Sequence, residues 1–170
     1  PKYKNFALTR SFLFSAIYPW VRADDTRFDN HPEKINVSDV KFGVVDGGFV
    51  QSLAMETYPQ ASMVSLPPST QGGEFYLSLV QKKFDITFQD INEAKAYLDE
   101  HPGAIRQVLG IPPIKIMPLV MVVPRESQSL KNAVDGALSE MIDNGFFEKI
   151  QEKYKAHYLL PQKSFSMDRF

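Results

Sequence analysis

The chain has 170 residues, of which 44% are hydrophobic, and it carries a formal net charge of −1. This near-neutral balance excludes a basic surface of the kind that holds nucleic acid or an anionic membrane. Cysteine is absent, which excludes disulfides and thiolate metal ligands, and no apolar run of about 18 residues predicts a membrane-spanning helix. The length suits one domain or two small lobes.

The first half of the chain alternates predicted strands with predicted helices. Apolar runs predict the strands, and apolar residues at helical spacing predict the helices. The segment 6–21 is rich in aromatic residues and contains Pro19, and it is predicted to be extended and largely buried. The predicted strands are 42–45 and 61–66, and the predicted helices are 50–58 and 71–83. This alternation is typical of an α/β fold with a mostly parallel sheet and helices on both faces.

The stretch 83–97 changes its period at Asp90. Before it, Phe84, Ile86 and Phe88 alternate with polar residues as in a half-buried strand, and after it apolar residues recur at helical spacing. A carboxylate at such a junction can cap the new helix. It can also face a crevice beyond the end of the strand, where α/β sheets bind ligands. Both interpretations stay open: an N-cap alone, or a carboxylate that holds the ammonium group of a ligand.

The second half of the chain predicts two short strands and two helices. The strands are expected at 105–109 and 119–123, and Ser127 is a candidate N-cap for the helix that follows. Asn144 and Gly145 suit the end of that helix, and the last helix is expected around 147–154. The tail 162–170 has no readable period.

The segment Val44 to Phe49 (V-V-D-G-G-F) joins a strand, a Gly-rich turn and a helix start. Such a junction can present amide N–H groups and the positive end of a helix dipole to an anion. It lacks the lysine of a phosphate loop and the glycine pattern of a dinucleotide fingerprint. An ordinary strand-to-helix turn is therefore equally consistent with Gly47 and Gly48.

Other polar residues carry weaker signals. Thr70 and Gln71 precede a predicted helix, so they either cap it or contribute to a ligand site. The histidines, His31, His101 and His157, are not at metal-ligand spacing with one another or with a carboxylate on a helix face. No serine lies in a G-x-S-x-G turn. We therefore assign no catalytic residue, no metal site and no cofactor.

Several of these motifs together resemble the extracellular solute-binding protein family 3, type II periplasmic binding proteins that feed ABC importers of amino acids. They are V-V-D-G-G-F, then F-D-I-T-F-Q-D ending at Asp90, then L-V-M-V-V-P-R-E-S. The closing segment is the most specific: D-N-G-F-F-E-K-I at 143–150, followed by Lys153 and Tyr154, is similar to the C-terminus of that family. The resemblance covers about residues 6–158.

The resemblance implies two α/β lobes joined by two hinge strands, with the ligand in the cleft between them. Residues 1–14 would end the first lobe and enter the hinge, 15–117 would form the second, ligand-binding lobe, and 118–170 would return to the first lobe and the tail. Family members have a long segment before the equivalent of Phe6, whereas five residues precede it here. The implied chain is thus a fragment, a complete second lobe with a partial first lobe.

The resemblance also implies a site and its partners. Asp90 matches the carboxylate that binds the ligand's α-ammonium group. Asp85 opens the same motif and is expected to be exposed or structural. Gly47, Gly48 and Phe49 match the turn where relatives place a hydroxyl residue, which this chain lacks. The implied function is non-catalytic capture of an amino acid or related amine in the periplasm, for an ABC permease, with the signal peptide outside this chain.

Two other functions fit the same resemblance. The fold also serves as the extracellular sensor domain of signalling receptors, and some relatives are dehydratases or are linked to lyases. An enzyme would need an acid–base pair, for which Glu74 or Glu93 would have to join Asp90. Because a partial first lobe would expose apolar surface, we also expect dimerisation or strand exchange.

Overall fold

The structure is a computed structural model that describes residues 5–164. The chain forms two compact units. The described residues of unit 1 are 5–16 and 116–164, and unit 2 is Ile17–Lys115. Each unit has its own hydrophobic core. No helix within 5–164 combines the length and the apolar character needed to cross a bilayer.

The larger sheet of the chain is mixed, and most of its strands belong to unit 2. Its order is β4 (Ser62–Leu66), β3 (Lys41–Val45), β5 (Ile86–Asp90), β2 (Leu13–Arg22) and β6 (Ile105–Gln107), and β7 (Lys115–Leu119) also pairs with β2. β3 runs parallel to β4 and β5, because crossover helices connect these strands and preserve their direction. β2 runs antiparallel to β5 and β6. The α/β class is confirmed, and the parallel part of the sheet is β4-β3-β5.

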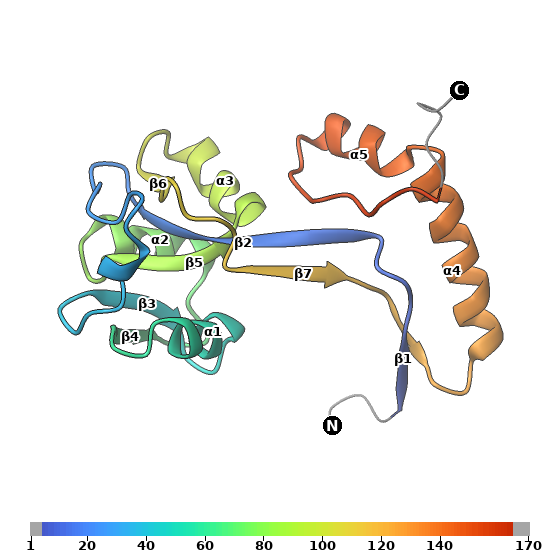
Figure 1. The fold of residues 1–170 in the computed structure, drawn as a ribbon, viewed down its shortest axis with the longest axis horizontal. Helices are drawn as coiled ribbons and strands as arrows, with labels where there is room; N and C mark the ends of the chain where they lie inside the picture. Colours follow the sequence, from blue (N-terminus) through green and yellow to red (C-terminus); the bar gives the residue numbers. More distant parts are fainter. Residues whose placement is uncertain (1–4, 165–170) are drawn as a thin grey trace. The chain divides into compact units, whose positions relative to one another are not determined.

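Helices cover both faces of this sheet, as the alternating pattern predicts. Towards α1 (Phe49–Thr57), the rings of Phe42, Tyr58 and Phe88 pack together, with the centroids of Phe42 and Phe88 4.7 Å apart. α2 (Gly72–Val80) and α3 (Ile91–Glu100) cover the other face, with α3 at the top of unit 2 in Figure 1. The core there comprises Trp20, Phe75, Tyr76, Leu79, Phe84, Ala94, Tyr97 and Ile105. A short 3-10 helix, η1 (Pro32–Lys34), lies in the loop before β3.

Pro19 lies inside β2, between two neighbouring strands. Its carbonyl oxygen accepts a hydrogen bond from the amide of Val108, 3.0 Å away, just beyond the end of β6. Because the N and O atoms of a strand residue point to the same side, the missing N–H of Pro19 falls at the end of the β2–β6 ladder. The β2–β5 ladder, where Pro19 is level with Phe88, keeps its hydrogen bonds, so the proline is tolerated.

Unit 1 contains the two-stranded ladder β1 (Phe6–Leu8) with β8 (Val122–Pro124) and the helices α4 (Gln128–Asp143) and α5 (Phe146–Tyr154). Gly145 joins the helices with φ of 76°, a left-handed conformation that glycine adopts cheaply. Leu13, Leu138, Ile142 and Phe147 form its core. The tail predicted at 162–170 lies outside the described residues from 165 onward.

One expectation for this region is wrong, and a second is confirmed only for the position of the residue. The run 119–123 is not one strand, because β7 ends at Leu119 and β8 begins at Val122. Between them the chain changes partner: the amide of Thr9 donates to the Met121 carbonyl at 3.0 Å, and the Met121 amide donates to the Thr9 hydroxyl at 2.9 Å. Ser127 occupies the N-cap position of α4, but its backbone is not extended (ψ 55°) and its side chain accepts no capping hydrogen bond.

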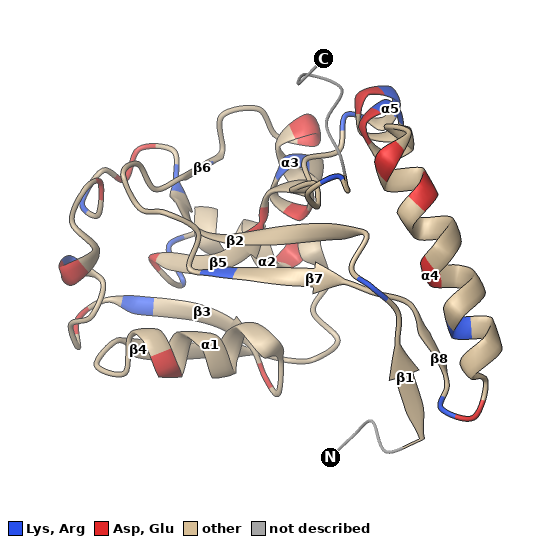
Figure 2. Cartoon of the chain, turned by 45° about the vertical axis from the view of Figure 1, so that its right-hand side comes forward, with Lys and Arg blue, Asp and Glu red and all other residues tan. Residues whose placement is uncertain are grey.

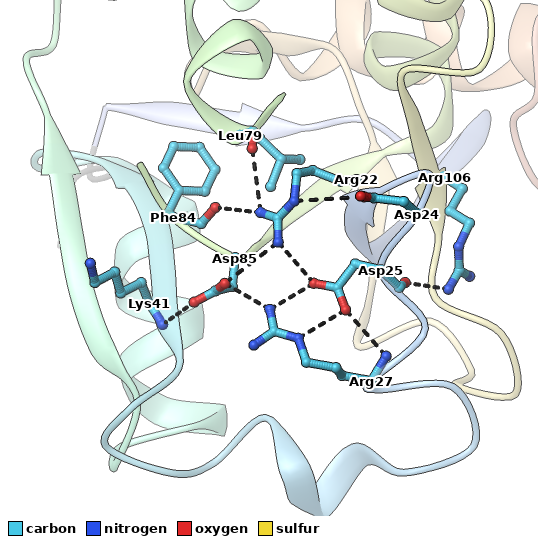
Figure 3. Close-up of polar contacts among 9 residues, drawn as sticks. All are labelled: Arg22, Asp24, Asp25, Arg27, Lys41, Leu79, Phe84, Asp85 and Arg106. Carbon is cyan, nitrogen blue, oxygen red and sulfur yellow. Dashed lines mark hydrogen bonds and ion pairs between the residues drawn. The ribbon is translucent and has the colours of Figure 1, made fainter. Parts of the chain in front are cut away.

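An ion-pair network lies at the amino ends of β3 and β5 (Figure 3). Arg27 donates to Asp25 at 2.7 Å and to Asp85 at 2.7 Å. Asp85 also accepts the Lys41 amide at 2.9 Å, which ties the start of β3 to the start of β5. Arg22 joins the network from the end of β2 through Asp25, 3.1 Å away. This network gives Asp85 a structural role, as expected.

Candidate functional site

Three neighbouring strands of unit 2 end at the same edge of the sheet, and a helix follows each of them in the chain. Val45 of β3 pairs with Leu66 of β4, and Phe42 of β3 pairs with Ile86 of β5 in parallel register. The starts of α1, α2 and α3 therefore gather at the carboxyl edge, opposite the ion-pair network. This edge is where open α/β sheets bind ligands, and all six residues singled out in the sequence lie along it.

Asp90 is both the last residue of β5 and the N-cap of α3. Its Oδ1 atom accepts hydrogen bonds from the amides of Asn92 (2.8 Å) and Glu93 (3.0 Å). The Asp90 backbone is extended, with ψ of 155°, which aims the carboxylate at the first turn of the helix. The capping role is confirmed. Binding of a ligand ammonium group by the same carboxylate stays a prediction.

The glycine turn before α1 does not present free amide groups to an anion. Gly47 is left-handed (φ 69°), and its amide donates to Oε1 of Gln51 at 2.9 Å. The Gly48 amide donates to the Val45 carbonyl at 3.0 Å and closes the turn. Both amides are thus engaged within the chain, and an anion would meet the amides of the first helical turn. Phe49 is 46% exposed, so its ring is available to pack over a ligand.

Thr70 and Gln71 do not cap α2 with their side chains. Gln71 occupies the N-cap position without a side-chain capping bond, and only its carbonyl enters the helix ladder, accepting from Phe75 at 2.9 Å. The Thr70 amide donates to the Pro67 carbonyl at 2.9 Å and closes the preceding turn. Thr70 and Glu74 line a cavity of about 510 Å³ beside α2. The expected cap is wrong for Gln71, and a ligand role for both residues stays a prediction.

The structure adds Tyr76, which the sequence did not single out, and places it beside Glu93, which the sequence offered only as a possible acid–base partner of Asp90. Both line a second cavity, of about 400 Å³, between α2 and α3. Partial desolvation, together with the neighbouring Asp90 carboxylate, raises the pKa of Glu93 above its ordinary value. The D-x-x-E spacing of Asp90 and Glu93 is a sequence signal for this pair, whereas Tyr76 lies in an apolar helix and has no such signal. Within the described residues, no three His, Cys, Asp or Glu side chains form a metal site.

The similarity of this chain to known proteins is a similarity of fold. No family model matches the sequence, and no curated protein sequence matches it significantly. Among solved structures, an ancestral amino-acid-binding protein described as a precursor of cyclohexadienyl dehydratase shares 22% identity, with a TM-score of 0.70 over 89% of this chain and 61% of that one. The chain has the fold of the type II periplasmic binding proteins.

Two natural proteins with this type II periplasmic binding-protein fold match over a similar length. The substrate-binding protein AbpA of an amino acid ABC transporter from Streptococcus pneumoniae, bound to L-arginine, has 19% identity and a TM-score of 0.69 over 88% of this chain and 61% of its own. A cysteine-binding protein from Campylobacter jejuni has 16% identity and a TM-score of 0.66 over 87% and 56%. The chain thus spans about three fifths of these proteins.

Proposed function

We propose that this chain is the ligand-binding part of a non-catalytic solute-binding protein that captures an amino acid or a related amine for an ABC importer. The observation that carries the proposal is the Asp90 carboxylate at the carboxyl end of β5, on a type II periplasmic binding-protein fold. A carboxylate at this edge supplies a charge-assisted hydrogen bond to an ammonium group. AbpA and the cysteine-binding protein, which share the fold, bind amino acids. The proposed location is the periplasm and the proposed partner is an ABC permease.

The surroundings of Asp90 support a ligand in contact with unit 2. Phe49 presents an exposed ring beside the glycine turn, and the first-turn amides of α1 offer donors for a carboxylate. Gly47 and Gly48 shape this turn rather than donate from it. We propose that Asp90 binds the ammonium group of the ligand. The turn formed by Gly47, Gly48 and Phe49 would contact the carboxylate of the ligand. Thr70 and Gln71 would form the neighbouring wall of the binding site.

The experiment is a thermal-shift screen of the chain against amino acids, polyamines and small organic acids. A ligand present at about a hundred times its Kd adds about 2.7 kcal/mol to the free energy of unfolding. We expect amine-bearing compounds to stabilise the protein, and we expect Asp90→Asn to weaken their binding about tenfold or more, the scale of a lost hydrogen bond to a charged group. Asn caps a helix as well as Asp does, so this variant keeps its fold while losing the charge.

Two matched variants separate capping from binding. Asp90→Ala should lose about 1 kcal/mol of stability through the cap in addition to losing the ligand. Asp99→Asn, at the exposed end of the same helix, should change neither the stability of the protein nor its binding of the ligand. An amine that stabilises the wild type and Asp90→Asn equally would show that Asp90 is only a cap and would overturn the proposal.

Two further measurements separate the proposed function from its alternatives. A ligand recovered chemically unchanged after long incubation supports binding, whereas conversion of a prephenate-like acid into product would favour an enzyme. Two observations favour the enzyme alternative: one structural relative is described as a precursor of cyclohexadienyl dehydratase, and the pKa of Glu93 is raised. A sensor domain would bind the same ligands, and its distinguishing measurement is whether the parent protein supports uptake of the labelled ligand.

We also propose that unit 1 associates through its β1–β8 ladder. The register of this ladder places Phe6, Leu8 and Val122 on one face, and each of these side chains is at least 44% exposed. An exposed apolar face on a two-stranded ladder is a site for association with a second copy. Light scattering across micromolar concentrations should give a mass that rises towards twice 19.3 kDa. A constant single-chain mass, equal to that of a Phe6→Ser control, would contradict this proposal.

A further inference from the structure

The cavity between α2 and α3 has the size of a small-molecule site. Its volume of about 400 Å³ falls within the range of about 300–1,000 Å³ found for ligand pockets. Gly72 and Gly73 form one wall, and no atom lies within 4 Å of where a Cβ at either position would be. This wall therefore leaves open space in which a ligand can approach the backbone of α2. The remaining wall includes Tyr76, Glu93, Tyr97 and Glu100.

Tyr76 is a buried polar side chain that lacks a partner. The residue is 2% exposed, and its hydroxyl makes no hydrogen bond within the described residues. Its ring is held in place by stacking on Tyr97, with centroids 4.8 Å apart. A buried hydroxyl without a partner is costly. A ligand that donates a hydrogen bond to this oxygen would remove that cost.

The charge in the pocket is negative and uncompensated. α3 carries three acidic residues and a single lysine (Figure 2), and Lys95 pairs with Asp99 away from the pocket. Within the described residues, neither Glu93 nor Glu100 has a cationic partner. Burial, and then the negative charges of Glu93 and Asp90, raise the pKa of Tyr76. A bound cation would relieve this unbalanced charge.

We propose that the α2–α3 pocket binds an organic ammonium ion, whose N–H groups donate to the Tyr76 hydroxyl and whose charge is balanced by Glu93 and Glu100. Two tyrosine rings and a hydroxyl suit an organic cation better than a metal ion, which requires several oxygen ligands at once. The described residues also contain no cluster of three metal-binding side chains. The proposed site consists of Tyr76, Glu93 and Glu100, and it does not depend on the proposed role of Asp90.

The experiment is a calorimetric titration of the chain with 1,4-diaminobutane and with tetramethylammonium, using n-butanol as the neutral probe. We expect 1,4-diaminobutane to bind more tightly than n-butanol by at least about tenfold, because only the amine balances the carboxylates. Tyr76→Phe should weaken the binding of the diamine about fivefold, and Glu93→Gln should weaken it about tenfold or more. Tetramethylammonium has no N–H to donate, so Tyr76→Phe should leave its affinity unchanged.

Both variants should remain folded, which keeps the test decisive. Tyr76→Phe deletes an unpartnered hydroxyl and Glu93→Gln deletes a desolvated charge, so the melting temperature of each should equal or exceed that of the wild type. Asp99→Asn, on the same helix outside the pocket, is the control and should bind like the wild type. Equal affinity for n-butanol and the diamine, or no binding of either cation, would overturn the proposal. Diamine binding lost in Asp90→Asn but retained in Glu93→Gln and Tyr76→Phe would also overturn it, and would support the proposed function instead.

Discussion

Replacement of Asp25 with alanine should lower the free energy of unfolding by about 3 kcal/mol, the lower end of the cost of breaking a buried ion pair. The Asp25 side chain is 4% exposed and accepts charged hydrogen bonds from Arg22 (3.1 Å) and Arg27 (2.7 Å). Arg22 is itself only 11% exposed, so losing Asp25 leaves a buried guanidinium with much less compensation. Urea unfolding, followed by circular dichroism, measures the change.

Asp24 provides the matched control. It lies 3.8 Å from the Nε atom of the same Arg22, but its side chain is 76% exposed. An exposed pair contributes about 0–1 kcal/mol, so Asp24→Ala should cost less than about 1 kcal/mol. Equal losses for the two alanine variants would show that burial of Asp25 does not determine the strength of the network.

The same network predicts a specific loss of stability in acid. Burial works to raise the pKa of Asp25, but hydrogen bonds from Arg27 and the charges of Arg27 and Arg22 outweigh it and lower the pKa below the ordinary value. Arg106 lowers the pKa of Asp29 in the same way. Because both folded-state pKa values are depressed, this stability is fully present above about pH 4 and is lost as the pH falls through the folded-state values. Asp25→Asn should show a shallower acid dependence than the wild type.

Gly43→Ala should cost about 3 kcal/mol, at the upper end of the range for an overpacked core. Gly43 lies in β3, between β4 and β5. A Cβ atom there would overlap Cδ2 of Phe84, whose side chain is fully buried and packs against Phe75 with ring centroids 5.1 Å apart. The ring has no solvent-facing space into which it can move. Chemical denaturation of the variant measures the loss.

A double-mutant cycle tests the stated cause. Phe84→Leu makes room beside Gly43, so the alanine should cost at least about 1 kcal/mol less in that background. Gly136→Ala is the control, because nothing lies within 4 Å of its Cβ position in α4. That substitution should stabilise the helix by about 0.5–1 kcal/mol. A Gly43→Ala protein that unfolds at the same urea concentration as the wild type would contradict the packing argument.

Much of unit 2 could be predicted from local sequence. The change of period at Asp90 located the end of β5 and the start of α3, and the structure confirms the capping hydrogen bonds to Asn92 and Glu93. The glycine turn at Gly47 and Gly48 was likewise placed correctly before α1. These features depend on residues within one helical turn of one another, so a single stretch of sequence contains all the information.

Other features depend on distant residues and could not be predicted in this way. The break at Val120 and Met121 follows from a hydrogen bond to Thr9, more than a hundred residues earlier in the chain. The proline-containing strand β2 was expected, but its antiparallel place between β5 and β6 was not readable from its own residues. Strand pairing is a choice among partners, and local periodicity does not encode the partner.

The sequence by itself determined the α/β class, the position of Asp90 and the absence of cysteine chemistry, because composition and short-range periodicity suffice for these. Only the tertiary structure decided that Tyr76 and Glu93 share one pocket, that Gln51 occupies the Gly47 amide, and that Asp25 is buried between two arginines. Each of these depends on how far a side chain is removed from water and on which groups surround it. Those quantities arise from packing between separate elements, and they set the charge balance on which the proposed ligand binding depends.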